Sequence, residues 1–228
     1  METVVITGAN RGIGLELTRQ FAANGWRVLA GCRAPDQASD LRRLAETHDV
    51  QVQTLDVANA GDVGAFRDKL GDQTIDVLIN NAGVFGGDRQ SQDDMDYDAW
   101  LDAFDVNTLA PFRLAMALKP NLARSGRPRI VTISSQMGAL SRESKGSFAY
   151  RSSKAAVNKV MQVLALELES EGIVACPVHP GWVRTDMGGA AADLSALESA
   201  AGLADLVANL TMEQSGKFWT WEGEELDW

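Results

Sequence analysis

The sequence predicts an α/β protein with a mostly parallel, doubly wound sheet of about seven strands and helices on both faces. Short β-branched runs alternate with amphipathic stretches along the chain, and the first run ends in a glycine-rich turn. Consecutive parallel strands need a crossover, normally a helix, so this alternation favours helices on both faces of the sheet. No linker, repeat or low-complexity block interrupts the pattern, and we interpret residues 1–228 as a single domain.

Element boundaries follow from local residue preferences. β-Branched and apolar runs predict strands, and glycine or asparagine after an amphipathic stretch predicts a helix end. The expected strands are 3–7, 27–30, 50–55, 75–79 and 129–133, with a sixth that begins at 173–176. The expected helices are 13–23, 40–47, two within 97–124 of which Pro111 opens the second, and about 150–170, ended by Gly172. The Ala/Leu-rich stretch that begins at 190–192 is expected to form a small mobile helix.

Composition and charge exclude several classes of protein. Hydrophobic residues make up 45% of the chain and charged residues 23%, as in ordinary globular domains. No apolar run approaches the ~20 residues that span a bilayer, and no basic segment precedes the first strand, so we expect neither a membrane span nor a secretory signal. The net charge of −10 argues against general affinity for nucleic acid or anionic membranes. Two cysteines are too few for a disulfide framework or a Cys-rich metal site, so we expect no metal and a reduced, cytoplasmic setting.

A glycine-rich turn joins the first strand to the first helix. Its sequence is Thr7-Gly8-Ala9-Asn10-Arg11-Gly12-Ile13-Gly14. Glycines here let the backbone turn tightly and approach a pyrophosphate, which would lie at the positive N-terminus of the helix. On its own, such a turn is also found as a plain strand-to-helix connection. Its place between the first strand and the first helix favours a dinucleotide site.

Basic residues near this turn indicate which dinucleotide is bound. Arg33 follows the second strand, where NAD-binding folds carry a carboxylate for the ribose 2′-hydroxyl and an arginine accommodates a 2′-phosphate. The nearest acid, Asp36, lies beyond Pro35. Taken alone, Arg33 would be a solvated surface charge, but Arg11 lies in the neighbouring glycine turn. The sequence therefore predicts a preference for NADP(H) over NAD(H).

Four motifs, in family order, resemble the short-chain dehydrogenase/reductase family. They are Thr-Gly-x3-Gly-x-Gly at 7–14, Asn80-Asn81-Ala82-Gly83, Tyr150-x3-Lys154 and Pro180-Gly181-Trp182-Val183. The likeness covers the chain from residue 3 to about residue 187, and the phrases around 148–156 and 179–189 are similar to the carbonyl reductase, sniffer and bacterial C-factor-like subgroup. The resemblance implies a Rossmann-type fold and NADPH-dependent reduction of a ketone or aldehyde to an alcohol.

The resemblance also implies residue roles. Tyr150 would be the general acid/base, Ser135 rather than Ser134 would polarise the carbonyl, and Lys154 would bind the nicotinamide ribose. Asn107 matches the asparagine that kinks a helix and supports a water relay to the lysine. The cofactor contacts carried over are Gly8, Asn10, Arg11, Gly12, Ile13, Gly14, Arg33, Asp56, Val57, Asn81, Ala82, Gly83, Tyr150, Lys154, Pro180, Gly181, Val183 and Thr185.

The tyrosine–lysine pair suits carbonyl reduction. Hydride delivery leaves negative charge on the carbonyl oxygen, which needs a proton and hydrogen-bond donors. A free tyrosine has a pKa near 10 and relays protons poorly at neutral pH. Lys154 lies one helical turn after Tyr150 on the same face, and a cation there is expected to lower the pKa of the tyrosine. Without a cofactor turn nearby, the two residues would be an ordinary helix-surface pair.

Two kinds of polar residue have a second interpretation. The family places Asp56 beside the adenine, although an aspartate here could equally cap a helix that starts near 58–59. His48 and His179 belong to no metal-ligand spacing, and we interpret both as structural.

The substrate pocket is expected to form from the variable segments 84–94, 136–148 and 186–200. Phe85, Met137, Phe148 and Met187 in these segments suggest an apolar chamber. Gly188-Gly189 lowers the cost of backbone rearrangement, so 186–200 is expected to be a mobile lid.

Other functions and the assembly state are also considered. A dinucleotide-binding regulator of C-factor type with little turnover is one alternative, but a sensor does not need the complete Asn–Ser–Tyr–Lys set. A 3-oxoacyl reductase is another, and the C-terminal phrases point away from it. The expected partner is a small-molecule carbonyl compound or alcohol. The family usually pairs the helices in 97–124 and 150–170, which implies a homodimer or homotetramer.

Overall fold

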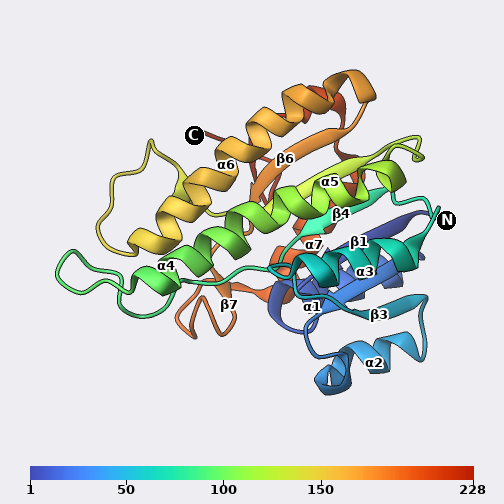
Figure 1. Cartoon of the computed structure of the whole chain (residues 1–228), viewed down its shortest axis with the longest axis horizontal. Helices are drawn as coiled ribbons and strands as arrows, with labels where there is room; N and C mark the ends of the chain where they lie inside the picture. The colour runs from blue at the N-terminus through green and yellow to red at the C-terminus, as the bar shows by residue number, and fades with distance from the viewer.

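The computed structural model describes residues 1–228 and contains an eight-stranded sheet with helices on both faces (Figure 1). The strands of this sheet are β1 (Thr3–Thr7), β2 (Arg27–Cys32), β3 (Val50–Thr54), β4 (Val77–Asn80), β5 (Arg129–Ile133), β6 (Val174–His179), β9 (Phe218–Thr220) and β10 (Glu225–Leu226). Their order is β10-β9-β6-β5-β4-β1-β2-β3, and only the β9–β10 pair is antiparallel. The predicted doubly wound fold is confirmed, and the tail strands bring the count to eight.

Seven α-helices and five short turns complete the fold. The helices are α1 (Gly12–Ala23), α2 (Ser39–Ala45), α3 (Ala60–Leu70), α4 (Tyr97–Phe104), α5 (Ala110–Leu122), α6 (Phe148–Leu168) and α7 (Ala196–Asn209). The 3₁₀ turns are η1 (Pro35–Gln37), η3 (Gln136–Gly138), η4 (Glu169–Glu171) and η5 (Met212–Gln214), whereas η2 (Asp105–Leu109) is a π turn between α4 and α5. None of these helices combines the length and the apolarity that crossing a bilayer requires.

Alternation along the central strands divides the interior into two cores. Val4 and Ile6 of β1 face one side and belong to the cluster that packs against α1, α2 and α7. Val5, between them, belongs to the cluster that packs against α3, α5 and α6. Because successive strand side chains point to opposite faces, one buried strand supplies both cores. This arrangement fixes α1, with the glycine turn, on one face and α6, with Tyr150, on the other (Figure 1).

Helix α7 corrects the expectation of a small mobile helix after 190–192. It is 14 residues long and begins with a capping box, in which Ser195 accepts from the Glu198 N–H and the Glu198 carboxylate accepts from the Ser195 N–H. Its inner face buries Leu203 and Val207 against α1. The pattern Ser195-x-x-Glu198 is a sequence signature of a helix start. The expectation of a small mobile helix rested on the Ala/Leu-rich composition of this stretch alone and did not use the pattern.

Candidate active site and cofactor cleft

The residues singled out in the sequence meet at one edge of the sheet. That edge carries the residues at or just after the ends of six parallel strands, in chain order Gly8, Arg33, Asp56, Asn81, Ser135 and Pro180. Strands β2 and β3 lie on one side of β1, and the chain then crosses to form β4 on the other side. Ligands of open α/β sheets bind at the carboxyl edge of such a switch point.

The turn after β1 fits a phosphate-bearing ligand. Helix α1 begins at Gly12, its N-cap residue Arg11 makes no side-chain capping hydrogen bond, and its first turn holds no acid. The free backbone N–H groups and the positive end of the helix dipole are therefore available to an anion. Gly12 has φ of 54°, a conformation that favours glycine. A Cβ on Gly14 would overlap the Gly8 carbonyl oxygen, so glycine lets α1 pack closely on the turn.

The Asn81–Gly83 segment holds this turn in place. The Asn81 side-chain amide donates to the carbonyl oxygens of Thr7, at 2.8 Å, and Gly8, at 3.2 Å. In return, the Thr7 hydroxyl accepts from the backbone N–H groups of Asn81 and Ala82, at 3.0 and 2.9 Å. The amide of Asn81 therefore ties β4 to the glycine turn, and any contact of this segment with a cofactor would come from its backbone and from Gly83.

The two arginines of the expected phosphate pocket have different partners. Arg33 is exposed after β2 and forms no ion pair. Arg11 forms an exposed ion pair with Asp186, at 2.6 Å, across to the segment after β7 (Val183–Arg184). Asn10 beside it is also exposed. Arg33 is thus free to meet a 2′-phosphate, whereas Arg11 would have to exchange Asp186 for it.

Asp56 does not cap a helix. Its carboxylate accepts from the Ala58 N–H at 3.1 Å in a local turn. The cap of α3 is Asn59, whose side chain accepts from Gly61 and Asp62. This finding corrects the capping alternative and leaves Asp56 half-buried at the sheet edge, next to the buried Val57.

The structure distinguishes between the two serines after β5. Ser134 is buried and its hydroxyl donates to Asn158 Oδ1 at 2.5 Å, inside the protein. Ser135 caps η3, accepting from the Met137 N–H at 3.1 Å, and its side chain interacts with Tyr150 so as to lower the pKa of the tyrosine. Two hydroxyls on different elements therefore converge at the sheet edge.

Burial, not the neighbouring lysine, dominates the electrostatics of Tyr150. Loss of hydration raises the pKa of Tyr150, and the hydrogen bond with Ser135 partly opposes this. Lys154 is also buried, and burial lowers its pKa to about 8. The Lys154 ammonium donates to the Ile133 carbonyl oxygen at 2.8 Å and lies 5.7 Å from the centre of the Tyr150 ring. Lys154 is not among the causes that shift the pKa of Tyr150 here, since the ammonium is directed at the end of β5, and the expected lowering by Lys154 stays a prediction for the cofactor-bound protein.

Asn107 lies in the π turn η2, where the α4–α5 helix is distorted. Its side chain makes two hydrogen bonds with the backbone of Val84: the side-chain oxygen accepts from the Val84 N–H at 2.9 Å, and the side-chain NH₂ donates to the Val84 carbonyl oxygen at 2.8 Å. A Cβ placed on Gly83 would lie 3.1 Å from Asn107 Oδ1 and 3.6 Å from Lys154 Nζ. Asn107 and Lys154 therefore flank the same point of the chain after β4.

Gln90 is a positioning residue that sequence reasoning missed. It is buried, and its side-chain oxygen accepts from the Tyr150 N–H at 3.0 Å while its amide donates to the Phe85 and Gly87 carbonyl oxygens. Phe85 packs on the Tyr150 ring with centroids 5.0 Å apart. A lone glutamine in a loop carries no sequence signal for such a role.

The segment after β6 lies on the glycine turn. Pro180 and Val183 are buried, Gly181 follows the strand, and the Thr185 side chain would contact a Cβ on Gly12 at 3.1 Å. The β7–β8 (Leu194–Ser195) pairing closes the loop 185–193. Residues 196–200 belong to α7, with Ser199 and Ala200 buried. The lid expected over 186–200 is therefore wrong at its C-terminal end, and only 185–193 has the character of a loop.

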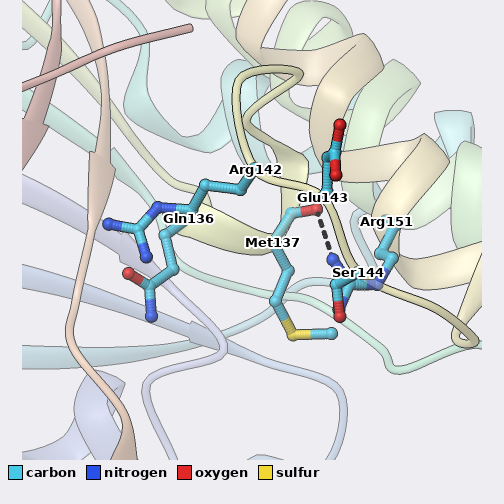
Figure 2. A pocket seen from close by; sticks show the side chains of 6 residues that line it. All are labelled: Gln136, Met137, Arg142, Glu143, Ser144 and Arg151. Carbon is cyan, nitrogen blue, oxygen red and sulfur yellow. Dashed lines mark hydrogen bonds between the residues drawn. The ribbon is translucent and has the colours of Figure 1, made fainter.

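A cavity of about 400 Å³ lies between the loop that follows Ser135 and the start of α6 (Figure 2). Its lining residues are Gln136, Met137, Arg142, Glu143, Ser144 and Arg151. A second cavity of about 740 Å³ shares four of these and extends along the first turns of α6. Of the four residues from which an apolar chamber is expected, Met137 lines both cavities and Phe148 lines the larger one.

Comparisons with known proteins agree with this architecture. The profile described as short chain dehydrogenase matches residues 2–194. The C-signal protein of Myxococcus xanthus is 40% identical over 155 residues, which cover 68% of this chain and 93% of that protein. The structure of the carbonyl reductase Sniffer of D. melanogaster superposes with a TM-score of 0.94 at 30% identity, covering 100% of both chains. The NADPH-bound carbonyl reductase from chicken fatty liver superposes with a TM-score of 0.93 at 30% identity, covering 100% of this chain and 99% of that one.

The match of the family profile extends from β1 to the start of β8 and includes the glycine turn, the Asn80–Gly83 segment and the Tyr150–Lys154 pair. The superposed structures add the tail strands that follow. The chain therefore belongs to the short-chain dehydrogenase family.

Proposed function

We propose that this protein reduces a small-molecule ketone or aldehyde to an alcohol with NADPH. The observation that carries the proposal is the convergence of Ser135 and Tyr150, whose interaction lowers the pKa of the tyrosine, with the buried Lys154 ammonium on the next turn of α6. Such a constellation supplies a proton and hydrogen-bond donors to one oxygen atom.

NADP(H) is proposed as the cofactor on three grounds. The first turn of α1 offers free N–H groups to a diphosphate, and Arg33 is an unpaired cation after β2 without a carboxylate beside it. The structurally similar chicken carbonyl reductase was solved with NADPH bound. The nicotinamide would supply the hydride. Gly8, Gly12, Gly83, Gly181 and Thr185 lie in the segments that follow β1, β4 and β6 at the same edge of the sheet, and would contact the cofactor through backbone or hydroxyl groups.

Tyr150 acts as the proton donor in this proposal. Its burial raises its pKa, so the phenol is protonated at neutral pH and is suited to donate to an oxygen that gains negative charge. Ser135 donates the second hydrogen bond to the same oxygen, while its own oxygen keeps the bond from the Met137 N–H. Gln90 accepts a hydrogen bond from the Tyr150 N–H, and Phe85 packs on the Tyr150 ring, so both residues help to fix the position of the tyrosine.

Lys154 holds a positive charge behind the reacting groups. Its ammonium would stabilise the tyrosinate that forms as Tyr150 gives up its proton, and would hydrogen-bond the cofactor ribose. Asn107 keeps the chain after β4 next to this ammonium through its bonds with Val84. Because the pKa of Lys154 is about 8, the charge and the turnover that depends on it should decline above about pH 8.

A signalling role is the second candidate, because C-signal of Myxococcus xanthus is 40% identical to 68% of this chain. Sustained consumption of NADPH with a carbonyl compound separates the two candidates. A panel of aldehydes, ketones and quinones, followed by NADPH absorbance, is the direct assay.

The chain offers a matched control for the role of Tyr150. Tyr97, the other of its two tyrosines, is exposed on α4. We expect Tyr150→Phe to bind NADPH and to lose turnover by a factor of about 10² or more, because the ring still packs and the proton donor is gone. Tyr97→Phe should reduce substrates like the wild type. Near-normal reduction by a folded Tyr150→Phe variant would reject the assignment.

A further inference from the structure

The cavity between the loop that follows Ser135 and the start of α6 carries positive charge that carbonyl reduction itself does not require. Arg142 forms no ion pair, and its one hydrogen bond is a backbone bond to the Ala139 carbonyl oxygen. Arg151 donates to neutral acceptors, the Ser144 hydroxyl at 2.7 Å and the Met137 carbonyl oxygen at 3.5 Å. The Nε of Arg151 is buried and has no partner. Neither guanidinium is neutralised by a carboxylate.

The local charge balance runs against that of the whole chain. The smaller cavity contains Arg142 and Arg151 against one acid, Glu143. The larger, contiguous cavity adds Lys145, and none of its 14 lining residues is acidic. In a protein with a net charge of −10, two contiguous cavities that together hold three cations against one acid attract anions that most of the surface repels.

The two cavities adjoin the loop that begins at Ser135. Met137 lines both of them; its N–H donates to the Ser135 hydroxyl at 3.1 Å, and its carbonyl oxygen accepts from Arg151 at 3.5 Å. Figure 2 shows Arg142 extending beside Gln136, with Met137 between them and Arg151.

We propose that this cavity binds a carboxylate carried by the substrate, while the carbonyl of the same molecule reaches Ser135 and Tyr150. A planar carboxylate can accept two hydrogen bonds from the Arg142 fork and further bonds from Arg151 or Lys145. The preferred substrates are therefore oxo acids, in which a carbonyl and a carboxylate belong to one small molecule. This inference rests on the proposed carbonyl reduction and adds the class of substrate.

A matched pair of aldehydes tests it in the wild-type protein. The para-formylbenzoate ion and methyl para-formylbenzoate present the same aldehyde and differ by one charge. We expect a KM for the carboxylate roughly threefold to tenfold below that for the ester, a difference that shrinks as salt concentration rises. Equal KM values for the two aldehydes at low salt would overturn the inference.

The variant Arg142→Gln tests whether the charge of Arg142 binds the carboxylate of the substrate. It should raise the KM for the carboxylate severalfold and that for the ester much less, so that the preference between them falls. Arg67→Gln makes the same change of charge on the exposed surface of α3 and should keep the wild-type preference. An unchanged preference in Arg142→Gln would assign the charge a role other than substrate binding.

A binding measurement separates failure of this inference from failure of the proposed function. If neither aldehyde consumes NADPH, carbonyl reduction is refuted for this class of compound. Calorimetric titration of the NADP-loaded protein with para-hydroxymethylbenzoate, and with its methyl ester, then reports on the cavity without turnover. Tighter binding of the carboxylate, lost in Arg142→Gln, supports the anion site, and equal binding of both compounds rejects it.

Discussion

Replacing Lys154 by methionine should stabilise the protein while it abolishes reduction. Burial lowers the pKa of Lys154 from 10.5 to about 8, which costs the folded state about 3 kcal/mol near neutral pH. Methionine fills a similar volume and carries no charge. It leaves the Ile133 carbonyl oxygen, 2.8 Å from the ammonium in the wild type, without this donor, at a cost of about 1–2 kcal/mol. The expected net gain in the free energy of unfolding is about 1–2 kcal/mol.

The pH dependence identifies the cause. Between pH 8 and 10.5 the unfolded wild type keeps a proton on Lys154 that the folded protein has released, so raising the pH favours folding through this group. From about pH 7 to about pH 9.5 the wild type should gain about 2 kcal/mol relative to Lys154→Met. Urea unfolding of both proteins at the two pH values measures this difference. Titration of the buried thiols Cys32 and Cys176 affects both proteins alike and cancels.

Lys159 provides the control, because it is an exposed lysine on the same helix. The variant Lys159→Met should show no change in relative stability with pH. If Lys154→Met is less stable than the wild type at every pH and the difference does not vary with pH, the buried ammonium does not carry the cost worked out above.

Three further predictions concern the cofactor cleft and α7. Arg33→Ala should weaken NADPH binding roughly tenfold or more and NADH binding far less, since only NADPH has a 2′-phosphate; fluorescence titration measures both, and equal weakening would reject Arg33 as the phosphate-binding residue. Ser195→Ala should cost about 1 kcal/mol in urea unfolding because it removes the capping box of α7, and an unchanged midpoint would contradict this. Hydrogen exchange should be fast in 185–193 of the free protein and slow in 196–209, and equal protection of both segments would mean that the loop is fixed.

The fold and the shared part of the site could be predicted because their signals are local. Strand runs, the glycine turn and Pro111 lie in short windows whose residue preferences specify one backbone shape. The edge at which the motifs meet follows from the parallel sheet, since strand ends converge there. Ser135 could be singled out by resemblance alone, and the structure adds the physical reason, because Ser134 is bonded to the buried Asn158.

What the sequence did not predict depends on tertiary distance. The Arg11–Asp186 ion pair joins residues 175 positions apart, and the bond from Tyr150 to Gln90 joins residues 60 apart. The raised pKa of Tyr150 depends on how deeply the phenol is buried, which residue spacing does not specify. The sequence did not predict the cavity lined by Arg142 and Arg151, because both residues have the sequence pattern of ordinary surface charges. Only the folding of the loop after η3 onto α6 brings them together.

The division of the interior by the sheet has a consequence for how this protein tolerates substitution. Val4 and Val5 are neighbours in the chain, yet they contribute to cores on opposite faces. Side chains in different cores share few contacts, so substitutions at distant positions in the two cores should have additive effects on stability, whereas contacting positions within one core should show coupling. Helix α1, which begins at the glycine turn, and helix α6, which carries Tyr150, therefore pack in different cores. Substitutions that repack the core on one face can therefore accumulate without changing the packing of the other. Residues at the carboxyl edge of the sheet are positioned by both cores, so substitutions in either core can affect them.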